Sequence, residues 1–236
     1  MGRDLINLLV TNKYVWRMHS DQQKSRSDIE RPTQAERSAL AEKKMVEATI
    51  KLLNTVGFAG TTLVAIGESA GYSRGLATHH FGSKQGLFLK VMKHITWIWT
   101  MELQKKTGDK TGLQAILAAL DAYRDYSRTL PDHARAMFIL WSGSVDPASD
   151  FKPNMIEFQR IQREAIAAWV AEGIRDGEIR NDVDPASFGE QFYSSLLGLN
   201  YQWLVNPEID LRKSFEVLKH NIVALIGQTP TEKEEK

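Results

Sequence analysis

The chain has 236 residues, of which 42% are hydrophobic and 25% are charged, and its formal net charge is +1. These values allow one large globular domain, or a small domain joined to a larger one. Because the sequence contains no cysteine, disulfides, thiolate zinc sites and cysteine nucleophiles are excluded, which fits a reducing cytoplasm. No apolar stretch approaches the roughly 20 residues that span a bilayer. We therefore expect a cytoplasmic protein without a membrane partner.

The charged residues are unevenly distributed along the chain. Residues 36–106 hold 10 basic and 5 acidic side chains, whereas residues 107–236 hold 14 basic and 20 acidic ones. A basic segment followed by an acidic body favours contact between the first segment and a polyanion such as DNA. The excess of basic residues in the first segment is also small enough to occur by chance.

The predicted elements begin after a polar lead-in that ends at Arg31-Pro32-Thr33. From Glu36 apolar residues recur at helical spacing, and Gly57 supplies a left-handed stop. Further helices are predicted at about 63–69, 74–80, 84–106, 111–129, 132–142, 154–176, 185–205 and 211–226. No stretch shows sustained strand alternation, so the predicted fold is all-α with about nine helices.

Residues 57–90 contain the most informative pattern in the chain. Thr62 and Ser73 each precede a short helical segment and can cap it, while Gly71 lies in the tight turn between the two segments. This order is typical of a helix-turn-helix, whose second helix enters the major groove of DNA. Gly67 lies inside the first of these helices, where glycine costs about 1 kcal/mol relative to alanine. We therefore expect that helix to be less rigid than usual.

The second helix of the motif begins with groups suited to DNA. Arg74 lies near its N-terminal end and can hydrogen-bond O6 and N7 of guanine. Gly75 has no side chain and permits close approach of the backbone. The residues placed to contact phosphates are Thr62, Ser73, Thr78, His79, His80 and Lys84. For Thr62 and Ser73, helix capping alone is also a sufficient reason to be present.

Over about residues 36–90 the sequence resembles a known family. The N-terminal domain of TetR-type transcriptional repressors has a similar order and spacing of residues, which here are Gly57, Thr61-Thr62, Ile66, Ala70-Gly71, Ser73, Gly75, Phe81, Ser83-Lys84 and Leu87-Phe88. The resemblance implies phosphate contacts from Lys84 and from the residues just before Phe81. It also implies an effector pocket among the helices that follow.

Nothing in the sequence assembles into a catalytic or metal-binding set. Adjacent helical residues such as His79 and His80 point about 100° apart and cannot chelate one ion together. The glycines near Lys84 lack the order of a phosphate-binding loop. We therefore expect no enzyme activity, no catalytic residue, no metal and no cofactor.

Aromatic residues are frequent after residue 90. They either pack the core or line a chamber for a small, partly apolar molecule. Trp97, Tyr123 and Trp141 fall on three successive predicted helices, and they are our candidates for contact with an unidentified small-molecule effector.

The last two predicted helices have apolar stripes interspersed with small residues. Part of each stripe faces its own core, and the remainder is expected to form a homodimer interface that includes Ser195, Gly198, Leu199 and Ile222. Two-fold pairing is what a helix-turn-helix protein needs to bind a palindromic operator.

Together these features predict four segments. They are a flexible N-terminal extension (1–35), a helix-turn-helix DNA-binding domain (36–83), a helical ligand-binding and dimerisation domain (84–228) and a charged tail (229–236). The expected protein is a repressor that binds double-stranded DNA at a palindromic operator as a homodimer and is released by a small-molecule effector. The alternatives are a non-specific, nucleoid-type DNA-binding protein and an all-helical enzyme.

Overall fold

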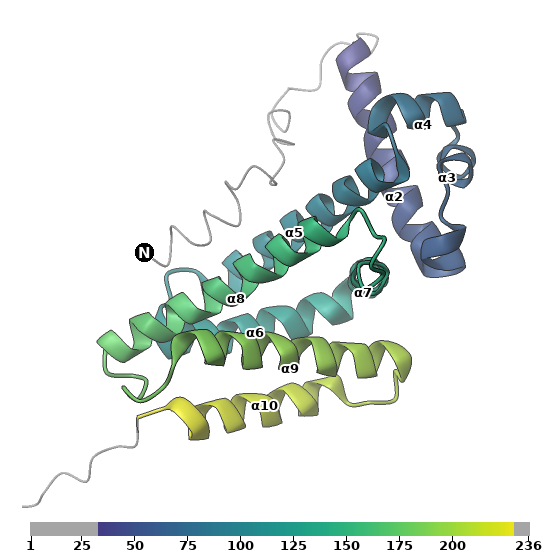
Figure 1. Cartoon of the computed structure of the whole chain (residues 1–236). Helices are drawn as coiled ribbons and strands as arrows, with labels where there is room; N and C mark the ends of the chain where they lie inside the picture. The colour runs from purple at the N-terminus through teal and green to yellow at the C-terminus, as the bar shows by residue number, and fades with distance from the viewer. Residues whose placement is uncertain (1–32, 229–236) are drawn as a thin grey trace, which may run out of the picture. The chain divides into compact units, whose positions relative to one another are not determined.

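The computed structural model describes residues 33–228, so the predicted tail at 229–236 and most of the predicted extension at 1–35 lie outside the described residues. The described chain forms nine α-helices (Figure 1). They are α2 (Gln34–Gly60), α3 (Leu63–Ala70), α4 (Arg74–Phe81), α5 (Lys84–Thr107), α6 (Gly112–Thr129), α7 (Pro131–Gly143), α8 (Lys152–Arg175), α9 (Pro185–Val205) and α10 (Leu211–Ile226). Outside the helices, residues 33–228 contain one isolated β-bridge, between Ile179 and Gly227. The all-α prediction is confirmed.

Residues 33–228 divide into two compact units. We call residues 33–98 and 132–155 the helix-turn-helix unit, and residues 99–131 and 156–228 the body unit. The division falls inside α5 and inside α8. The two units are defined by contacts between residues and not by function. The domain boundary expected after residue 83 therefore stays a prediction.

In the helix-turn-helix unit, α2 begins at a capping box. The Thr33 hydroxyl accepts the Glu36 N–H at 3.2 Å, and the Glu36 carboxylate accepts the Thr33 N–H at 2.7 Å. Near the other end, Gly57 has a φ of 71°, in the region that favours glycine, and a short helical turn continues to Gly60. The left-handed glycine predicted at position 57 is confirmed.

The core of this unit lies along one face of α2 and one face of α5. Met45 and Leu53 of α2 are fully buried, and so are Leu87, Val91 and Ile95 of α5. The three α5 residues are spaced by four, so they lie on one side of the helix. α2 also packs against α3, which in turn packs against α4.

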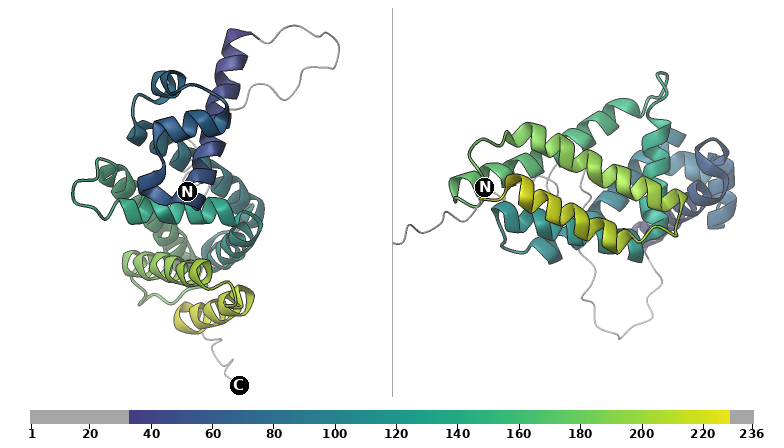
Figure 2. Two further views of the ribbon diagram at one scale, coloured as in Figure 1. Left: turned by 90° about the vertical axis from the view of Figure 1, so that its right-hand side faces the viewer. Right: turned by 90° about the horizontal axis from the view of Figure 1, so that it is seen from below.

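The body unit buries one continuous apolar cluster. Its members come from α5, α6, α8, α9 and α10, and among them Leu120, Trp169 and Phe215 are almost completely buried. α10 packs on α6 and on α9, and α9 and α10 lie side by side in both views of Figure 2. A Cβ at Gly189 of α9 would lie 2.7 Å from the Arg163 carbonyl oxygen of α8. α8 and α9 therefore approach so closely at this point that a side chain at position 189 would clash with the backbone of α8.

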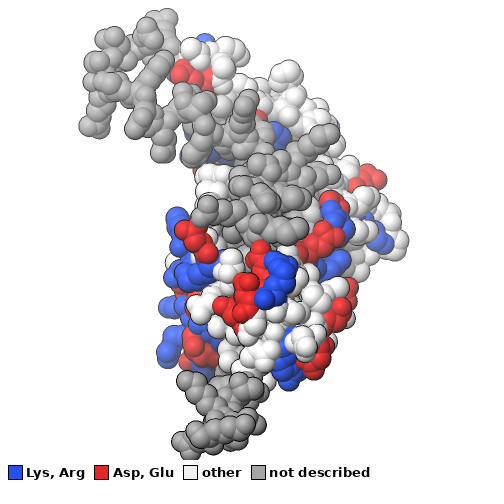
Figure 3. Space-filling model, turned by 90° about the vertical axis from the view of Figure 1, so that its left-hand side faces the viewer, with Lys and Arg blue, Asp and Glu red and all other residues white. Residues whose placement is uncertain are grey.

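Ion pairs reinforce the packing of α10 on α6. Arg124 contacts Glu216 at 3.1 Å, and Lys219 contacts Asp121 at 2.7 Å. Lys106 of α5 also reaches Asp125 of α6 at 2.8 Å. Basic and acidic side chains are interspersed on the described part of the face drawn in Figure 3. Such interspersed charges favour local ion pairs and do not produce a large electrostatic field of one sign.

Among residues 33–228, every helix is too short or too polar to cross a lipid bilayer.

Candidate nucleic-acid interface

Both helices of the predicted motif begin at hydroxyl caps. The Thr62 hydroxyl accepts the Ala65 N–H at 3.2 Å, and the Ser73 hydroxyl accepts the Leu76 N–H at 3.2 Å. Each bond satisfies one of the amide groups that a helix start leaves without an intrahelical partner. The remaining amides at the start of α4 point outward as a weak positive pole, which is where a phosphate can bind.

The turn between α3 and α4 is fixed by glycine. Gly71 has a φ of 77°, and its N–H donates to the Glu68 carbonyl at 3.1 Å. The Tyr72 N–H donates to the Gly67 carbonyl at 2.7 Å. A Cβ on Gly67 would lie 2.9 Å from the Tyr72 carbonyl oxygen. Gly67 therefore lets the turn fold closely against α3, a packing role that helix propensity alone does not reveal.

α4 separates its polar and apolar residues onto two faces. Ala77 and Phe81 are buried, whereas Arg74, Gly75, Thr78 and His79 are exposed. His80 is half-buried, and its ring lies 5.9 Å from that of Phe81. The Thr78 hydroxyl donates to the Arg74 carbonyl at 3.0 Å, which leaves its lone pairs available as acceptors. The exposed face thus presents a guanidinium, a hydroxyl and an imidazole within two turns.

Lys84 is engaged inside the unit. Its ammonium donates to the Phe58 carbonyl at 2.6 Å, near the end of α2, and lies 4.9 Å from the centroid of the Phe58 ring. It also lies 5.3 Å from the Phe88 ring, so it has cation–π contacts with both rings. Burial lowers the pKa of Lys84 from its ordinary value. Lys84 therefore ties α5 to the end of α2, and its contact with phosphate stays a prediction.

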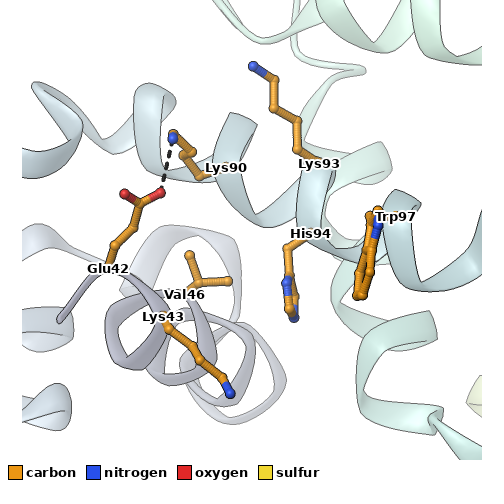
Figure 4. A pocket seen from close by; sticks show the side chains of 7 residues that line it. All are labelled: Glu42, Lys43, Val46, Lys90, Lys93, His94 and Trp97. Carbon is orange, nitrogen blue, oxygen red and sulfur yellow. Dashed lines mark ion pairs between the residues drawn. The ribbon is translucent and has the colours of Figure 1, made fainter. Parts of the chain in front are cut away.

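A pocket in this unit lies between α2 and α5 (Figure 4), and only one of its residues was a candidate from the sequence. Trp97 lines it, as do residues that the sequence analysis did not single out: Glu42, Lys43, Val46, Lys90, Lys93 and His94. The spacing of the four α5 residues, at 90, 93, 94 and 97, places them on one face of that helix. From the sequence, this spacing could indicate that the four residues share a face of the helix. It could not show which other helix packs against that face.

The other two candidate effector contacts have different surroundings. Trp141 is half-buried in the helix-turn-helix unit, and its ring centroid lies 5.1 Å from that of Phe138. Tyr123 belongs to the body unit, where it makes an edge contact with Trp99 at 5.3 Å. Burial raises the pKa of Tyr123 well above its ordinary value. Neither residue lines the pocket that contains Trp97, so a shared effector site for all three stays a prediction.

The expected dimer residues lie on α9 and α10 in different environments. Ser195 and Gly198 are half-buried, and a Cβ on Gly198 would meet nothing within 4 Å. Leu199 packs partly against the core of the body unit, and Ile222 is only 5% exposed within that core. Exposed apolar side chains on the same two helices are Tyr201, Val205, Val217, Val223 and Leu225. These residues are better placed than Ile222 to contact a second chain.

Comparison with known proteins identifies the motif. Residues 45–91 match the family model described as bacterial regulatory proteins, tetR family. Over these residues the chain is similar to regulators of the tetR family. Its resemblance to that family, which the sequence analysis based on residues 36–90, is confirmed.

One curated protein that the chain resembles is named HTH-type transcriptional regulator BetI 1, from Chromohalobacter salexigens. It is 26% identical over 121 residues, which cover 50% of this chain and 57% of the relative. The chain therefore spans little more than half the length of the curated relatives it matches. The match is to a protein named as a transcriptional regulator and not as an enzyme.

Solved structures of TetR-type proteins share the fold. A TetR transcriptional regulator from Chloroflexus aurantiacus superposes with a TM-score of 0.72 at 22% identity, covering 82% of this chain and 99% of that one. SmeT in complex with triclosan superposes with a TM-score of 0.69 at 18% identity, covering 80% and 93%. SmeT is described as the repressor of a multidrug efflux pump of Stenotrophomonas maltophilia. At these identities the likeness concerns the fold alone.

Proposed function

We propose that this chain is a ligand-responsive transcriptional regulator, a repressor that binds a palindromic operator in double-stranded DNA as a homodimer. The observation on which the proposal chiefly rests is the outward face of α4. It begins at the capped Ser73 and exposes Arg74, Thr78 and His79, while Ala77 and Phe81 anchor the helix from behind. A helix of this kind fits the major groove with its N-terminal residues toward the base edges.

Within this proposal Arg74 contacts a base, and the neighbouring polar groups contact phosphates. Arginine can make two parallel hydrogen bonds to guanine, which distinguishes that base from the others. Thr62, Ser73, Thr78, His79 and His80 supply hydroxyls, imidazoles and helix-start amides that position the helix without reading sequence. Such a regulator would act in the cytoplasm, where bacterial DNA is found.

The exposed apolar side chains of α9 and α10 support the homodimer. Tyr201 is 53% exposed, Val205 67% and Leu225 60%, and all three lie on the last two helices of the body unit. A groove of about 320 Å³ between these helices is lined by residues that include Phe188, Phe192 and Leu225. Exposed apolar surface rimmed by polar residues marks an association site. A second copy of the chain would double the number of DNA half-sites that are bound at once.

Release by an effector is the third part of the proposal. Its support is the pocket beside Trp97 and the fold shared with SmeT, which has been solved in complex with triclosan. An effector must bind the DNA-free conformation more tightly than the DNA-bound one, because a ligand with equal affinity for both shifts nothing.

Selection of bound sites from random duplex DNA tests the proposal. We expect a palindrome, together with a dimer in sedimentation. Arg74→Ala should weaken binding to the selected site by about 1–3 kcal/mol and relax the preference at one base pair of each half-site. Arg128→Ala, which removes an exposed arginine at the end of α6, is the matched control and should bind as wild type. Steeply salt-dependent binding without sequence preference would instead favour a nucleoid-type protein.

A further inference from the structure

The last turn of α2 ends in carbonyl groups that need partners from outside the helix. After the left-handed Gly57 the chain makes one short helical turn, and the N–H and the hydroxyl of Thr61 both donate to the Gly57 carbonyl. The carbonyls of Phe58 and Ala59 belong to the end of the helix, where intrahelical partners run out and the negative pole of the helix lies. A lysine or arginine in the last turn commonly satisfies such carbonyls, but the last turn of α2 contains no basic residue.

Lys84 supplies the missing cation from the start of α5. Its ammonium donates to the Phe58 carbonyl at 2.6 Å and to the Ala59 carbonyl at 3.4 Å. Lys84 is the first residue of α5, where the positive pole of that helix disfavours a cation. The Ser83 hydroxyl, which accepts the Gly86 N–H at 3.0 Å, caps the start of α5 instead. The lysine is therefore unfavourable for its own helix and favourable for the end of α2.

The side chain of Phe58 is held by the same group of residues. Its ring centroid lies 4.9 Å from that of Phe88 in α5, and the Lys84 ammonium lies 4.9 Å from the Phe58 ring. The ring also packs against Gly143, the last residue of α7, since a Cβ added there would lie 2.6 Å from Phe58 Cε2. The turn after Gly57 is therefore fixed to α5 and to α7.

This turn leads directly into the DNA-binding motif. Thr61 and Ile66, at the junction and in α3, are fully buried, so the start of α3 cannot move independently of the turn. α2 packs against α3, and α3 packs against α4. A displacement of the turn is therefore passed on to α4. The two parallel hydrogen bonds expected from Arg74 to a base need an accurately oriented helix, so they are sensitive to such a displacement.

We propose that Lys84 is a positioning residue for the DNA-binding helix α4, which acts through the turn at Phe58 and not by touching DNA. Contact with a phosphate, which the sequence predicted for the same ammonium, would require it to leave the Phe58 carbonyl and both rings. Lys84 is half-buried, and burial lowers its pKa from the ordinary value, in keeping with a group that faces the protein. This inference rests on the proposed function, because it assigns a role within DNA binding.

The experiment measures the affinity of Lys84→Met and of the wild-type chain for two DNA probes. One probe is the duplex enriched by selection from random DNA, and the other is a random-sequence duplex of the same length. Fluorescence anisotropy over a series of KCl concentrations gives the affinity and its salt slope. We expect Lys84→Met to weaken the selected duplex about tenfold, because the base contact of α4 is misplaced. The random duplex should lose less than about twofold, since sequence-independent attraction does not require an exact orientation of α4.

The salt slope separates positioning from phosphate contact. Loss of a phosphate contact should reduce the magnitude of the slope by about 0.9, whereas loss of a positioning contact should leave it at the wild-type value. Lys152→Met is the matched control. Lys152 is also the first residue of a helix in the helix-turn-helix unit, but it is exposed. This variant should bind both probes as wild type.

Two further variants test whether Lys84 acts through Phe58. Phe58→Leu removes the ring, so Lys84→Met added to it should weaken the selected duplex by less than about threefold, because contacting residues are not additive. Gly143→Ala changes no charge but forces its Cβ against the Phe58 ring. It should weaken the selected duplex, with the random duplex and the salt slope unchanged. Circular dichroism verifies that each variant is folded under the assay conditions, and Gly143→Ala serves alone if Lys84→Met is not.

Three results would overturn the proposal. A flatter salt slope in Lys84→Met, with similar losses on both duplexes, would assign the lysine to a phosphate. Similar losses with an unchanged slope would mean only that less of the chain is folded. Unaltered binding of the selected duplex by Gly143→Ala would show that the turn at Phe58 does not position α4. A wild-type chain that binds neither duplex would refute the proposed function itself, and this is seen before any variant is measured.

Discussion

The two helices of the DNA-binding motif and the long helices of the body unit are held in place by different forces. α3 and α4 have eight residues each and bury only two apiece. Their ends are set by the hydroxyls of Thr62 and Ser73 and by the left-handed Gly71 between them. In the body unit, 18 buried residues from five helices and one loop form a single cluster. The first region combines short-range capping bonds with a few buried side chains, whereas a continuous apolar cluster holds the second.

This difference determines where polar groups can be displayed. A helix held by its caps needs only a narrow apolar stripe, so most of the surface of α4 can carry groups for a polyanion. A helix held by a continuous core must bury a wider face, as α6 does with nine buried residues. We therefore expect changes in the core of the body unit to have the largest effects on folding, and changes in the motif to have smaller effects on folding than on DNA binding.

The largest expected effect is that of Phe215→Ala in α10. Phe215 is 1% exposed in the core of the body unit, and its truncation should lower the free energy of unfolding by about 3–5 kcal/mol through lost burial and a cavity. Urea denaturation followed by circular dichroism measures the change. Val217→Ala, two residues away and 51% exposed, should alter stability by less than about 0.5 kcal/mol. Equal effects of the two substitutions would contradict the assignment of the core.

Two glycines of α9 should respond to alanine in opposite directions. Gly189→Ala brings a Cβ to 2.7 Å from the Arg163 carbonyl oxygen, and the forced separation of α8 and α9 should cost about 1–3 kcal/mol. At Gly198 a Cβ would meet nothing within 4 Å, so Gly198→Ala should raise the stability of the monomer by up to about 1 kcal/mol through helix propensity. Thermal unfolding of both variants measures the contrast, and a loss at Gly198 similar to that at Gly189 would instead indicate a close contact with a second chain.

In the motif, Ser73→Ala removes the cap of α4 and should cost about 1 kcal/mol of stability. Because the same helix start faces the expected phosphate, the substitution should also weaken operator binding. Ser69→Ala is a matched control, since Ser69 is an exposed serine of α3 that caps no helix. Chemical denaturation and fluorescence anisotropy with labelled DNA give the two quantities. If Ser73→Ala lowers the stability but leaves the DNA affinity unchanged, the role of Ser73 is structural only.

The smallest expected effect is a pH dependence of the free energy of unfolding, which arises from two histidines of the helix-turn-helix unit. The rings of His94 and His133 lie 6.0 Å apart. Burial lowers the pKa of both; His133 and Lys43 lower that of His94 further, whereas Glu47 raises both and Asp132 raises that of His133. The unfolded chain therefore takes up protons at a higher pH than the folded chain. The free energy of unfolding should fall as the pH drops below about 6.5.

His94→Gln should flatten this decline when denaturation is compared between pH 7.5 and pH 5.5. His220→Gln, which alters an exposed histidine of α10, should keep the wild-type slope. A decline that is unchanged in His94→Gln would assign the effect to other groups.

Several features could be predicted from the sequence because they depend on neighbours within a few residues. The caps at Thr62 and Ser73 and the left-handed Gly57 and Gly71 are all found where periodicity and residue type indicated. The N-cap at Asp184 with Pro185 at the start of α9 follows the same rule. Capping bonds join residues three apart, and glycine is favoured wherever φ is positive, so both leave a signature in the sequence.

Other features could not be predicted because they depend on residues far apart in the chain. The bond from Lys84 to the Phe58 carbonyl, the need for glycine at position 189 and the meeting of Lys93 with the α2 residues all arise from helix packing. Periodicity shows that a helix has an apolar face, but many arrangements of helices can bury that face. The sequence by itself therefore determined the helices, their ends and the outward groups of α4. The tertiary structure alone decided which lysine is engaged inside the unit, which glycines are required and where a pocket lies, since those depend on which helix surfaces come into contact.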